Sequence, residues 1–262
     1  MIKAFASGFA EIATRPLLLV PALLGMFLNV LVIALSVDSY ANIIFDTLIE
    51  GNVPAASMLK LPFYMASSYA SDLLIIGMAM FVSMLIAYYL TFAYAIALSG
   101  KRKGVFGSLL SAASRAPEVL FLTVFTFAAA FLYCIAAFLL LAAAMAGEEL
   151  GIVALPLLLG WMLLGVYAVL KLAFTPIAMA SGGSKLKEAL AQSWKWTSGR
   201  FLETALFFFI LMMATILIGS AVTWLSGLTE SEPVSFIILV LGMALLNSYY
   251  TVVFIRYYTD SK

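Results

Sequence analysis

The chain has 262 residues, of which 65% are hydrophobic and 10% are charged, with a formal net charge of +1 and a mean hydropathy of +1.13. A soluble domain carries about 25% charged residues, and a folded soluble protein of this size cannot hide so much apolar surface, so a soluble fold is excluded. The same apolar content excludes a disordered chain. The near-zero net charge gives no reason to expect nucleic acid as a partner.

Six apolar segments are long enough to cross a membrane, since an α-helix needs about 20 apolar residues for a hydrocarbon layer of about 30 Å. These segments are Leu17–Val37, Leu73–Leu98, Val119–Ala146, Ile152–Ala173, Thr204–Leu225 and Val234–Ile255. They are apolar all round, whereas strands of a membrane barrel alternate apolar and polar residues. The sequence therefore predicts an all-α integral membrane protein with six transmembrane helices.

The segments between these helices differ in length. After the first helix, Tyr40–Ile49 is predicted to form a short amphipathic helix on the outer surface. The third and fourth helices are joined by residues 147–151, and the fifth and sixth by residues 226–233. Connections this short predict two tight antiparallel hairpins.

The placement of lysine and arginine predicts the orientation, because these residues accumulate in cytoplasmic loops. With a cytoplasmic N-terminus, twelve of the fourteen basic residues lie inside, while Lys60 lies outside and Lys171 lies within the fourth helix. The twelve are Lys3, Arg15, Lys101, Arg102, Lys103, Arg115, Lys185, Lys187, Lys195, Arg200, Arg256 and Lys262. Eight of the thirteen acidic residues lie on the other side. Both the N- and C-termini are therefore predicted to be cytoplasmic.

A similar short element precedes the first, third and fifth transmembrane helices, at residues 1–15, 104–115 and 185–197. Each has apolar residues three or four positions apart, which would share one helix face. They are Ile2, Phe5, Phe9 and Ile12 in the first element, Phe106, Leu109, Leu110 and Ala113 in the second, and Leu186, Leu190 and Trp194 in the third. Basic residues flank them, so we predict three cytoplasmic interfacial amphipathic helices that lie in the headgroup region.

Each short element ends in a turn that carries an arginine: Arg15, Arg115 or Arg200. We therefore predict one membrane domain over residues 1–262 with three sub-repeats, 1–100, 101–182 and 183–262. The alternative is that these elements are only the basic, amphipathic inner loops that many membrane proteins have.

The basic residues near the third short element are candidates for binding lipid headgroups or partner proteins. Lys171 is the only basic residue inside a transmembrane segment, where it could contact a ligand, form a structural pair, or extend its stem to the interface. Ser184 is predicted to cap the helix that follows, and the turn around Gly183, beside lysines, could hold a lipid phosphate. The full candidate set is Lys171, Ser184, Lys185, Lys187, Lys195, Arg200 and Arg115.

A second set of polar residues lies on the first, second and sixth helices. It comprises Asn29, Tyr88, Tyr89, Asn247 and Tyr250. A buried amide or hydroxyl needs a hydrogen-bond partner, so these side chains could simply join helices together. The alternative is a polar cavity between the three helices.

The chain offers little material for catalysis or metal binding. It has no histidine and one cysteine, Cys134, which we interpret as a small apolar residue of a membrane helix. No metalloprotease, serine-hydrolase or nucleotide-binding motif occurs. We therefore expect no catalytic residue, no metal and no cofactor, although a hydrolase that pairs a serine with Lys171 stays as a third hypothesis.

Residues 170–201 carry a recognisable pattern: a basic residue late in the fourth helix, an apolar stretch, a glycine turn and a closing Gly-Arg-Phe. In this chain the pattern is Lys171, Pro176, Gly183, Glu188-Ala189-Leu190, Ser193, Gly199, Arg200 and Phe201. It resembles prokaryotic six-helix membrane proteins, which include the membrane domain of some glycerophosphodiester phosphodiesterases and related archaeal and bacterial families. The resemblance implies a multi-pass protein of a prokaryotic cell membrane. In those phosphodiesterases an appended soluble domain performs the catalysis, so no activity is implied here.

Two functions fit these features. The first is a non-catalytic membrane protein that organises lipids or partner proteins, including copies of itself, through its basic cytoplasmic face. The alternative is a transporter for a small solute or a lipid-linked molecule, which would pass through the predicted polar cavity.

Overall fold

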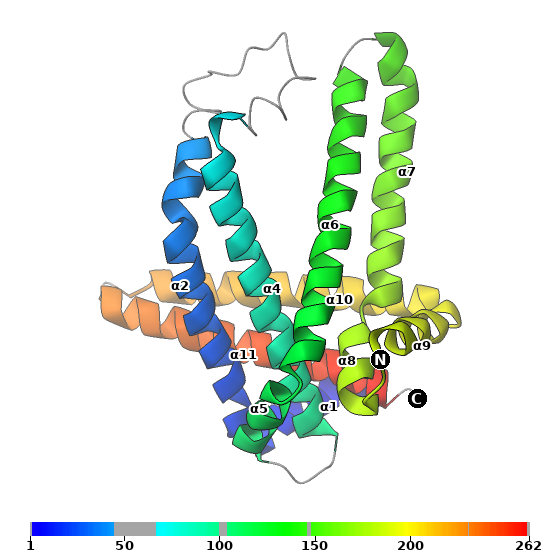
Figure 1. Cartoon of the computed structure of the whole chain (residues 1–262). Coiled ribbons are helices and arrows are strands. Elements are labelled where there is room, and N and C mark those ends of the chain that lie inside the picture. Colours follow the sequence, from blue (N-terminus) through cyan, green and yellow to red (C-terminus); the bar gives the residue numbers. More distant parts are fainter. Residues whose placement is uncertain (1, 45–66, 100–103, 146–147, 230, 261–262) are drawn as a thin grey trace. The chain divides into compact units, whose positions relative to one another are not determined.

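The six predicted membrane helices are confirmed as helices. A computed structural model describes residues 2–44, 67–99, 104–145, 148–229 and 231–260, and among these residues it contains helices and no β-strand (Figure 1). Six helical stretches are long and apolar enough to cross a membrane: Pro16–Ile44, Ala70–Leu98, Ala116–Ala144, Leu150–Gly182, Phe201–Gly227 and Glu232–Thr259. The chain therefore has the helices of a multi-pass membrane protein.

The first, second and third spans extend beyond their predicted bounds at one or both ends. The first consists of a short 3-10 helix, η1 (Pro16–Leu18), and α2 (Leu19–Ile44), the second is α4 (Ala70–Leu98), and the third is α6 (Ala116–Met145). Because α2 continues to Ile44, the prediction of a separate surface helix from Tyr40 is wrong for Tyr40–Ile44, and the rest of that segment lies outside the described residues. No glycine or proline between Asp38 and Ile44 stops the helix.

The fourth span is interrupted near its end. Helix α7 (Glu148–Leu172) is followed by α8 (Thr175–Gly182), with Pro176 in the first turn of α8, where a missing backbone N–H costs nothing. The last two spans are α10 (Phe201–Gly227) and α11 (Glu232–Thr259), which pack against each other. They form one of the two predicted hairpins.

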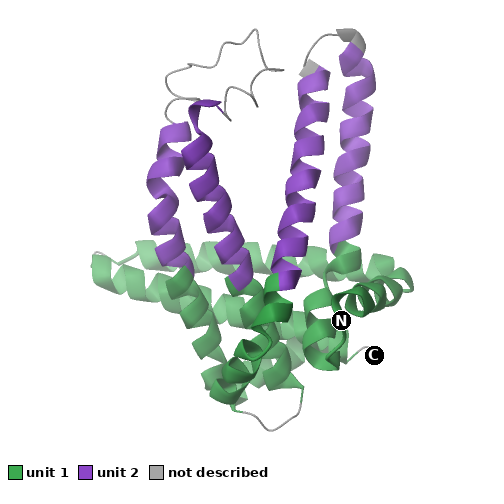
Figure 2. Ribbon diagram, in the orientation of Figure 1, with its two compact units in different colours: residues 1–28, 86–120, 170–262 green, residues 29–85, 121–169 purple. Residues whose placement is uncertain are grey.

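The described residues fall into two compact units (Figure 2). Unit 1 comprises residues 1–28, 86–120 and 170–262, and unit 2 comprises residues 29–85 and 121–169. The helices α2, α4, α6 and α7 each contribute residues to both units. The two units are therefore described separately.

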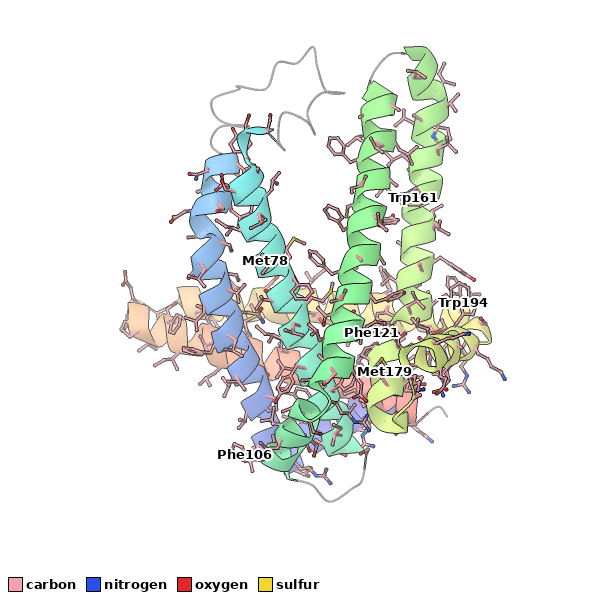
Figure 3. All side chains as sticks on the ribbon, viewed as in Figure 1. Met78, Phe106, Phe121, Trp161, Met179 and Trp194 are labelled. Carbon is pink, nitrogen blue, oxygen red and sulfur yellow. The ribbon has the colours of Figure 1, made fainter. Side chains whose placement is uncertain are left out.

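In unit 2, α6 and α7 are joined by a reciprocal pair of aromatic residues. Tyr133 donates its hydroxyl to the carbonyl of Trp161 (3.0 Å), and Trp161 Nε1 donates to the carbonyl of Tyr133 (3.2 Å). The two rings stack with their centroids 5.3 Å apart, and Gly165 lies against the Tyr133 ring, where a side chain would collide with it. Trp161 is labelled in Figure 3. These contacts fix the second predicted hairpin, because each buried polar atom of the pair is satisfied by the opposite helix.

In unit 1, three short helices occupy the predicted places: α1 (Ile2–Thr14), α5 (Val105–Ala113) and α9 (Leu186–Ser198). Their buried residues share one register relative to the arginine of the following turn. The residues seven and three positions before that arginine are buried in all three helices: Gly8 and Ile12, Ser108 and Ala112, and Ser193 and Thr197. The residue seven positions after it is buried as well: Ala22, Leu122 and Phe207. This common register supports the predicted sub-repeats, which stay a prediction.

The buried faces of the short helices differ from the predicted apolar faces. In α1, Ile12 is buried, whereas Ile2 and Phe9, which were expected on the same face, are exposed. In α5, small residues are buried, whereas Phe106 (labelled in Figure 3) and Leu110 are exposed. Small residues allow two helices to approach closely, so they line the contacts, and the bulky residues point away from the protein.

The second and fourth membrane helices, α4 and α7, are each linked by a hydrogen bond to the short helix that follows in the chain. Tyr89 of α4 donates to the carbonyl of Leu109 in α5 (2.9 Å), and Ser193 of α9 donates to the carbonyl of Lys171 in α7 (2.7 Å). Tyr249 of α11 donates in the same way to the carbonyl of Phe5 in the short helix α1 (3.3 Å). The sixth membrane helix is therefore linked to the first short helix.

Helix α1 packs on α11 through Gly8, whose hydrogen faces Val253. The centre of unit 1 is aromatic: Phe174 contacts the rings of Trp196 (centroids 4.7 Å apart) and Tyr258 (5.2 Å), and Phe207 stacks on Tyr257 (3.8 Å). These rings come from α9, α10 and α11 and from the turn between α7 and α8, where Phe174 lies. They place α9 beside the start of α10 and the end of α11.

Candidate functional site around the third short helix

Helix α9 presents two different surfaces. Its small residues Ala189, Ser193 and Thr197 are buried, at intervals of four positions, and the remaining sides carry most of its charge. Lys187 and Lys195 are exposed, as is Arg200, which follows the helix, and Trp194 lies among them with 45% of its surface exposed (Figure 3). Lysine and arginine near an exposed tryptophan form the surface that favours a membrane–water boundary.

Lys171 is buried, with only 3% of its surface exposed. Its Nζ donates to Ser198 Oγ (2.7 Å) and lies 5.3 Å from the ring centre of Trp194 and 5.7 Å from that of Phe201. Ser198 Oγ in turn donates to the carbonyl of Trp194 (2.7 Å). Of the three interpretations of Lys171, extension to the interface does not fit this burial, whereas a structural role does, because the ammonium is held by one hydroxyl and two aromatic faces.

Arg115 donates hydrogen bonds to carbonyl groups at the C-terminal end of α8. Its Nη1 donates to the carbonyls of Met179 (3.0 Å; labelled in Figure 3) and Ala180 (3.1 Å), which are among the last carbonyls of α8, and its Nε lies 3.9 Å from Glu118. A cation at a helix C-terminus satisfies carbonyls that have no partner within the helix. This guanidinium is therefore already engaged with the protein.

Ser184 contributes to the same helix end, so its prediction as an N-cap is wrong. The N-cap of α9 is Lys185, which is exposed and makes no side-chain capping bond, whereas Ser184 donates to the carbonyl of Ala178 (3.2 Å) in α8. Gly183 closes α8 in the left-handed conformation with φ of 63°. Residues 182–184 thus form a helix C-cap, which exposes carbonyls rather than the N–H groups that a phosphate needs.

A hollow of about 470 Å³ lies beside α9. Its lining residues are Gln192, Lys195 and Trp196 from the last turns of α9 and Tyr258 from the end of α11. The guanidinium carbon of Arg200 lies 5.5 Å from the ring centre of Trp196. Of the lining residues, sequence reasoning selected Lys195 and missed the other three, since nothing in the chain order brings Tyr258 next to α9.

The predicted polar set on the first, second and sixth helices is distributed over several surroundings. Tyr89 links α4 to α5, Tyr250 packs on Phe254 of its own helix, and Asn247 is exposed. Tyr88 is half-buried in α4, and Asn29 is half-buried in α2.

A buried polar contact nevertheless joins the first, second and sixth helices. Tyr94 of α4 donates to the carbonyl of Leu18 (2.6 Å) and lies 2.8 Å from Ser248 Oγ of α11, which is also 3.4 Å from the Leu18 carbonyl. All three residues are buried. The three helices are thus joined by satisfied hydrogen bonds at this point, and Ser248 is the chain neighbour of the predicted Asn247.

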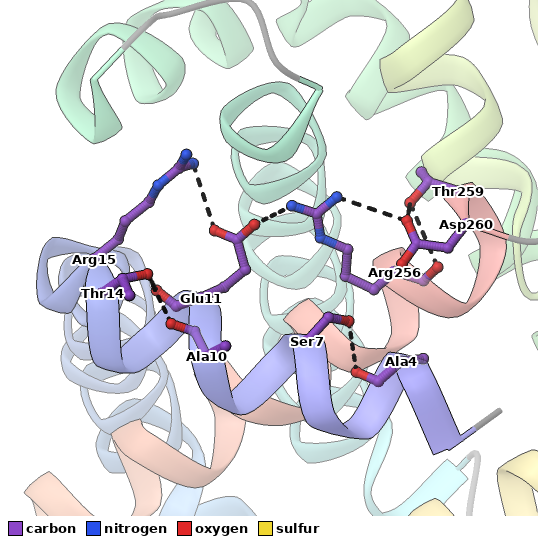
Figure 4. A network of polar contacts seen from close by, with 9 residues as sticks. All are labelled: Ala4, Ser7, Ala10, Glu11, Thr14, Arg15, Arg256, Thr259 and Asp260. Carbon is purple, nitrogen blue, oxygen red and sulfur yellow. Dashed lines mark hydrogen bonds and ion pairs between the residues drawn. The ribbon is translucent and has the colours of Figure 1, made fainter.

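A cluster of ion pairs that the sequence analysis missed connects the two ends of unit 1 (Figure 4). Glu11 of α1 bonds to Arg256 of α11, and the same carboxylate lies 3.5 Å from Arg15, while Arg256 lies 3.7 Å from Asp260. The Glu11 and Arg256 side chains are 16% and 22% exposed. Glu11, the one acidic residue among residues 1–15, was the available sign of this cluster in the sequence. A carboxylate in a short basic element is expected to pair with a cation from elsewhere in the fold.

Among the described residues, no group of histidine, cysteine, aspartate and glutamate side chains could hold a metal ion. Comparisons with protein-family models, with curated proteins and with solved structures give no match. The resemblance of residues 170–201 to the glycerophosphodiester phosphodiesterase membrane domain therefore stays a prediction.

Proposed function

We propose that this multi-pass protein organises anionic lipids at the cytoplasmic face of the membrane through the surface of α9. The observation that carries the proposal is the exposed group of Lys187, Lys195 and Arg200 around the half-exposed Trp194. Each cation near an anionic membrane surface contributes about 1 kcal/mol of attraction, and the indole favours the headgroup region.

The other two short helices support the proposal. Their small residues pack on the protein, and Phe9, Phe106 and Leu110 are exposed on other sides. Bulky apolar residues that are exposed next to a membrane helix gain free energy when they enter the lipid boundary. We infer that α1, α5 and α9 all lie in the headgroup region, on the side where the basic residues accumulate.

The proposal requires that the short helices lie on the cytoplasmic side, with both termini there. We expect a cysteine at Ser7 of α1 or at Ala191 of α9 to be labelled by a membrane-impermeant maleimide only after the cells are opened, because the positive residues hold these helices inside. The single native cysteine, Cys134, is first replaced by alanine. Labelling in intact cells would reverse the orientation and contradict the proposed cytoplasmic surface.

Lipid retention tests the function itself. In nanodiscs that contain phosphatidylglycerol and phosphatidylcholine, we expect the triple variant Lys187→Gln, Lys195→Gln, Arg200→Gln to retain about ten to a hundred times less phosphatidylglycerol than the native chain, since three charges are lost. Native mass spectrometry after partial delipidation counts the lipids that stay bound.

The matched control is Glu188→Gln, which removes an exposed charge of opposite sign from the same helix. Retention of phosphatidylglycerol by this variant should be equal to or higher than that of the native chain, because a repulsive charge is removed. The proposal is wrong if the triple variant keeps its phosphatidylglycerol, or if the native chain shows no preference over phosphatidylcholine.

A further inference from the structure

The hollow beside α9 lies at one end of a membrane-spanning hairpin. Gln192, Lys195 and Trp196 precede the first residue of α10 by a few positions, and Tyr258 is the next-to-last residue of α11. The start of α10 and the end of α11 are the same end of an antiparallel pair. Because both helices are long enough to cross the hydrocarbon layer, their common end lies at the depth of the headgroups.

The polar groups of the hollow favour an anion. Lys195 and Trp196 lie three and four positions after Gln192 and are therefore both its neighbours on the surface of α9. Lys195 provides an ammonium group, and Gln192 provides an amide that can donate two hydrogen bonds. Arg200 adds a second cation next to a lining residue, since its guanidinium carbon lies 5.5 Å from the centre of the Trp196 ring.

Trp196 also has a buried donor without a partner. Its Nε1 makes no hydrogen bond to any described residue, although the atom is covered. Three aromatic rings pack against the indole: Phe174, Tyr257 and Tyr258, with centroid separations of 4.7, 5.5 and 5.3 Å. An unsatisfied buried N–H is costly, so an acceptor that reaches Nε1 is favoured.

We propose that this hollow is a specific site for the phosphate of an anionic phospholipid headgroup. Lys195 and Arg200 neutralise the phosphate, and Gln192 and Trp196 donate hydrogen bonds to its oxygens. The volume of about 470 Å³ exceeds that of a phosphate ion. The inference rests on the proposed function, since it assigns one defined site within the basic surface of α9.

The test compares two lysines on the same helix. Lys195 lines the hollow, whereas Lys187 is exposed outside it. In nanodiscs of phosphatidylcholine with a small fraction of phosphatidylglycerol, we expect Lys195→Gln to weaken phosphatidylglycerol binding about tenfold, because a charge-assisted hydrogen bond is lost. Lys187→Gln should weaken it less, by at most about fivefold, which corresponds to the attraction of one exposed cation to an anionic membrane. Native mass spectrometry measures both.

A second variant, Trp196→Phe, removes the indole N–H but keeps a ring among the aromatic neighbours. It should weaken phosphatidylglycerol binding about fivefold, provided that its thermal unfolding midpoint stays near that of the native chain. Lys195 is exposed, so Lys195→Gln tests the site even if the tryptophan variant unfolds.

The outcomes separate the site from the broader function. If Lys187→Gln and Lys195→Gln weaken binding equally, the hollow is not a site, and the basic surface as a whole remains the explanation. If the native chain does not prefer phosphatidylglycerol, both proposals fail. If millimolar inorganic phosphate displaces the lipid from the hollow, the site binds free phosphate and its assignment to a lipid is overturned.

Discussion

Replacing Arg256 by methionine is expected to lower the free energy of unfolding by about 2–3 kcal/mol, because Glu11 then keeps a largely buried carboxylate with only a longer contact to Arg15. Methionine preserves most of the apolar stem of the arginine, so the loss reports on the ion pair rather than on packing. The measurement is the thermal or SDS-induced unfolding of the purified protein in detergent.

A double-mutant cycle isolates the contact between α1 and α11. Glu11→Gln combined with Arg256→Met should cost less than the sum of the single changes, with a coupling energy of about 1–2 kcal/mol. Arg15→Gln is the matched control, since the Arg15 side chain is 58% exposed and its ion pair with Glu11 is longer; we expect a loss of at most about 0.5 kcal/mol. Equal losses of stability for Arg15→Gln and Arg256→Met would show that the Glu11–Arg256 ion pair does not join α1 to α11.

Truncation of Lys171 to alanine is expected to lower the free energy of unfolding by about 3 kcal/mol. The change removes a buried aliphatic stem, the hydrogen bond to Ser198 and the contacts of the ammonium with Trp194 and Phe201. Lys171→Met should cost only about 1 kcal/mol or less, because an apolar side chain of similar volume needs no desolvation of a charge.

The methionine variant also separates a structural role of Lys171 from a ligand-binding one. If Lys171 only holds α7 against α9, Lys171→Met keeps its phosphatidylglycerol, as counted by native mass spectrometry. A folded Lys171→Met chain that has lost this lipid would make Lys171 a headgroup ligand, as the sequence first suggested, and would contradict the structural role.

The sequence was sufficient to predict which segments are membrane helices and where the three short helices lie, because both depend on local hydrophobicity and spacing. It was insufficient for the ends of the helices. The extension of α2 to Ile44 and the break between α7 and α8 at Phe174 depend on how far the chain can continue its own hydrogen bonds, which hydrophobicity does not report.

The faces of the helices were harder to predict than their positions. In α1, Ile12 is buried while Ile2 and Phe9, predicted on the same face, are exposed, because small residues make the close helix contacts in membranes. In α11, Ser248 rather than Asn247 is buried. The helix is apolar on all sides, so its sequence shows no preferred face from which to choose between adjacent polar residues.

The contact of Tyr249 with Phe5 joins residues that are 244 positions apart. At about 5–20 residues per second, a ribosome needs roughly 12–50 s to synthesise the interval between them. The links of α4 to α5 and of α7 to α9 can form in order during this time. Helix α11, which α1 contacts, has not yet been synthesised. Helix α1 can therefore make its contact with α11, including the Glu11–Arg256 pair, only after the links between the intervening helices have had time to form.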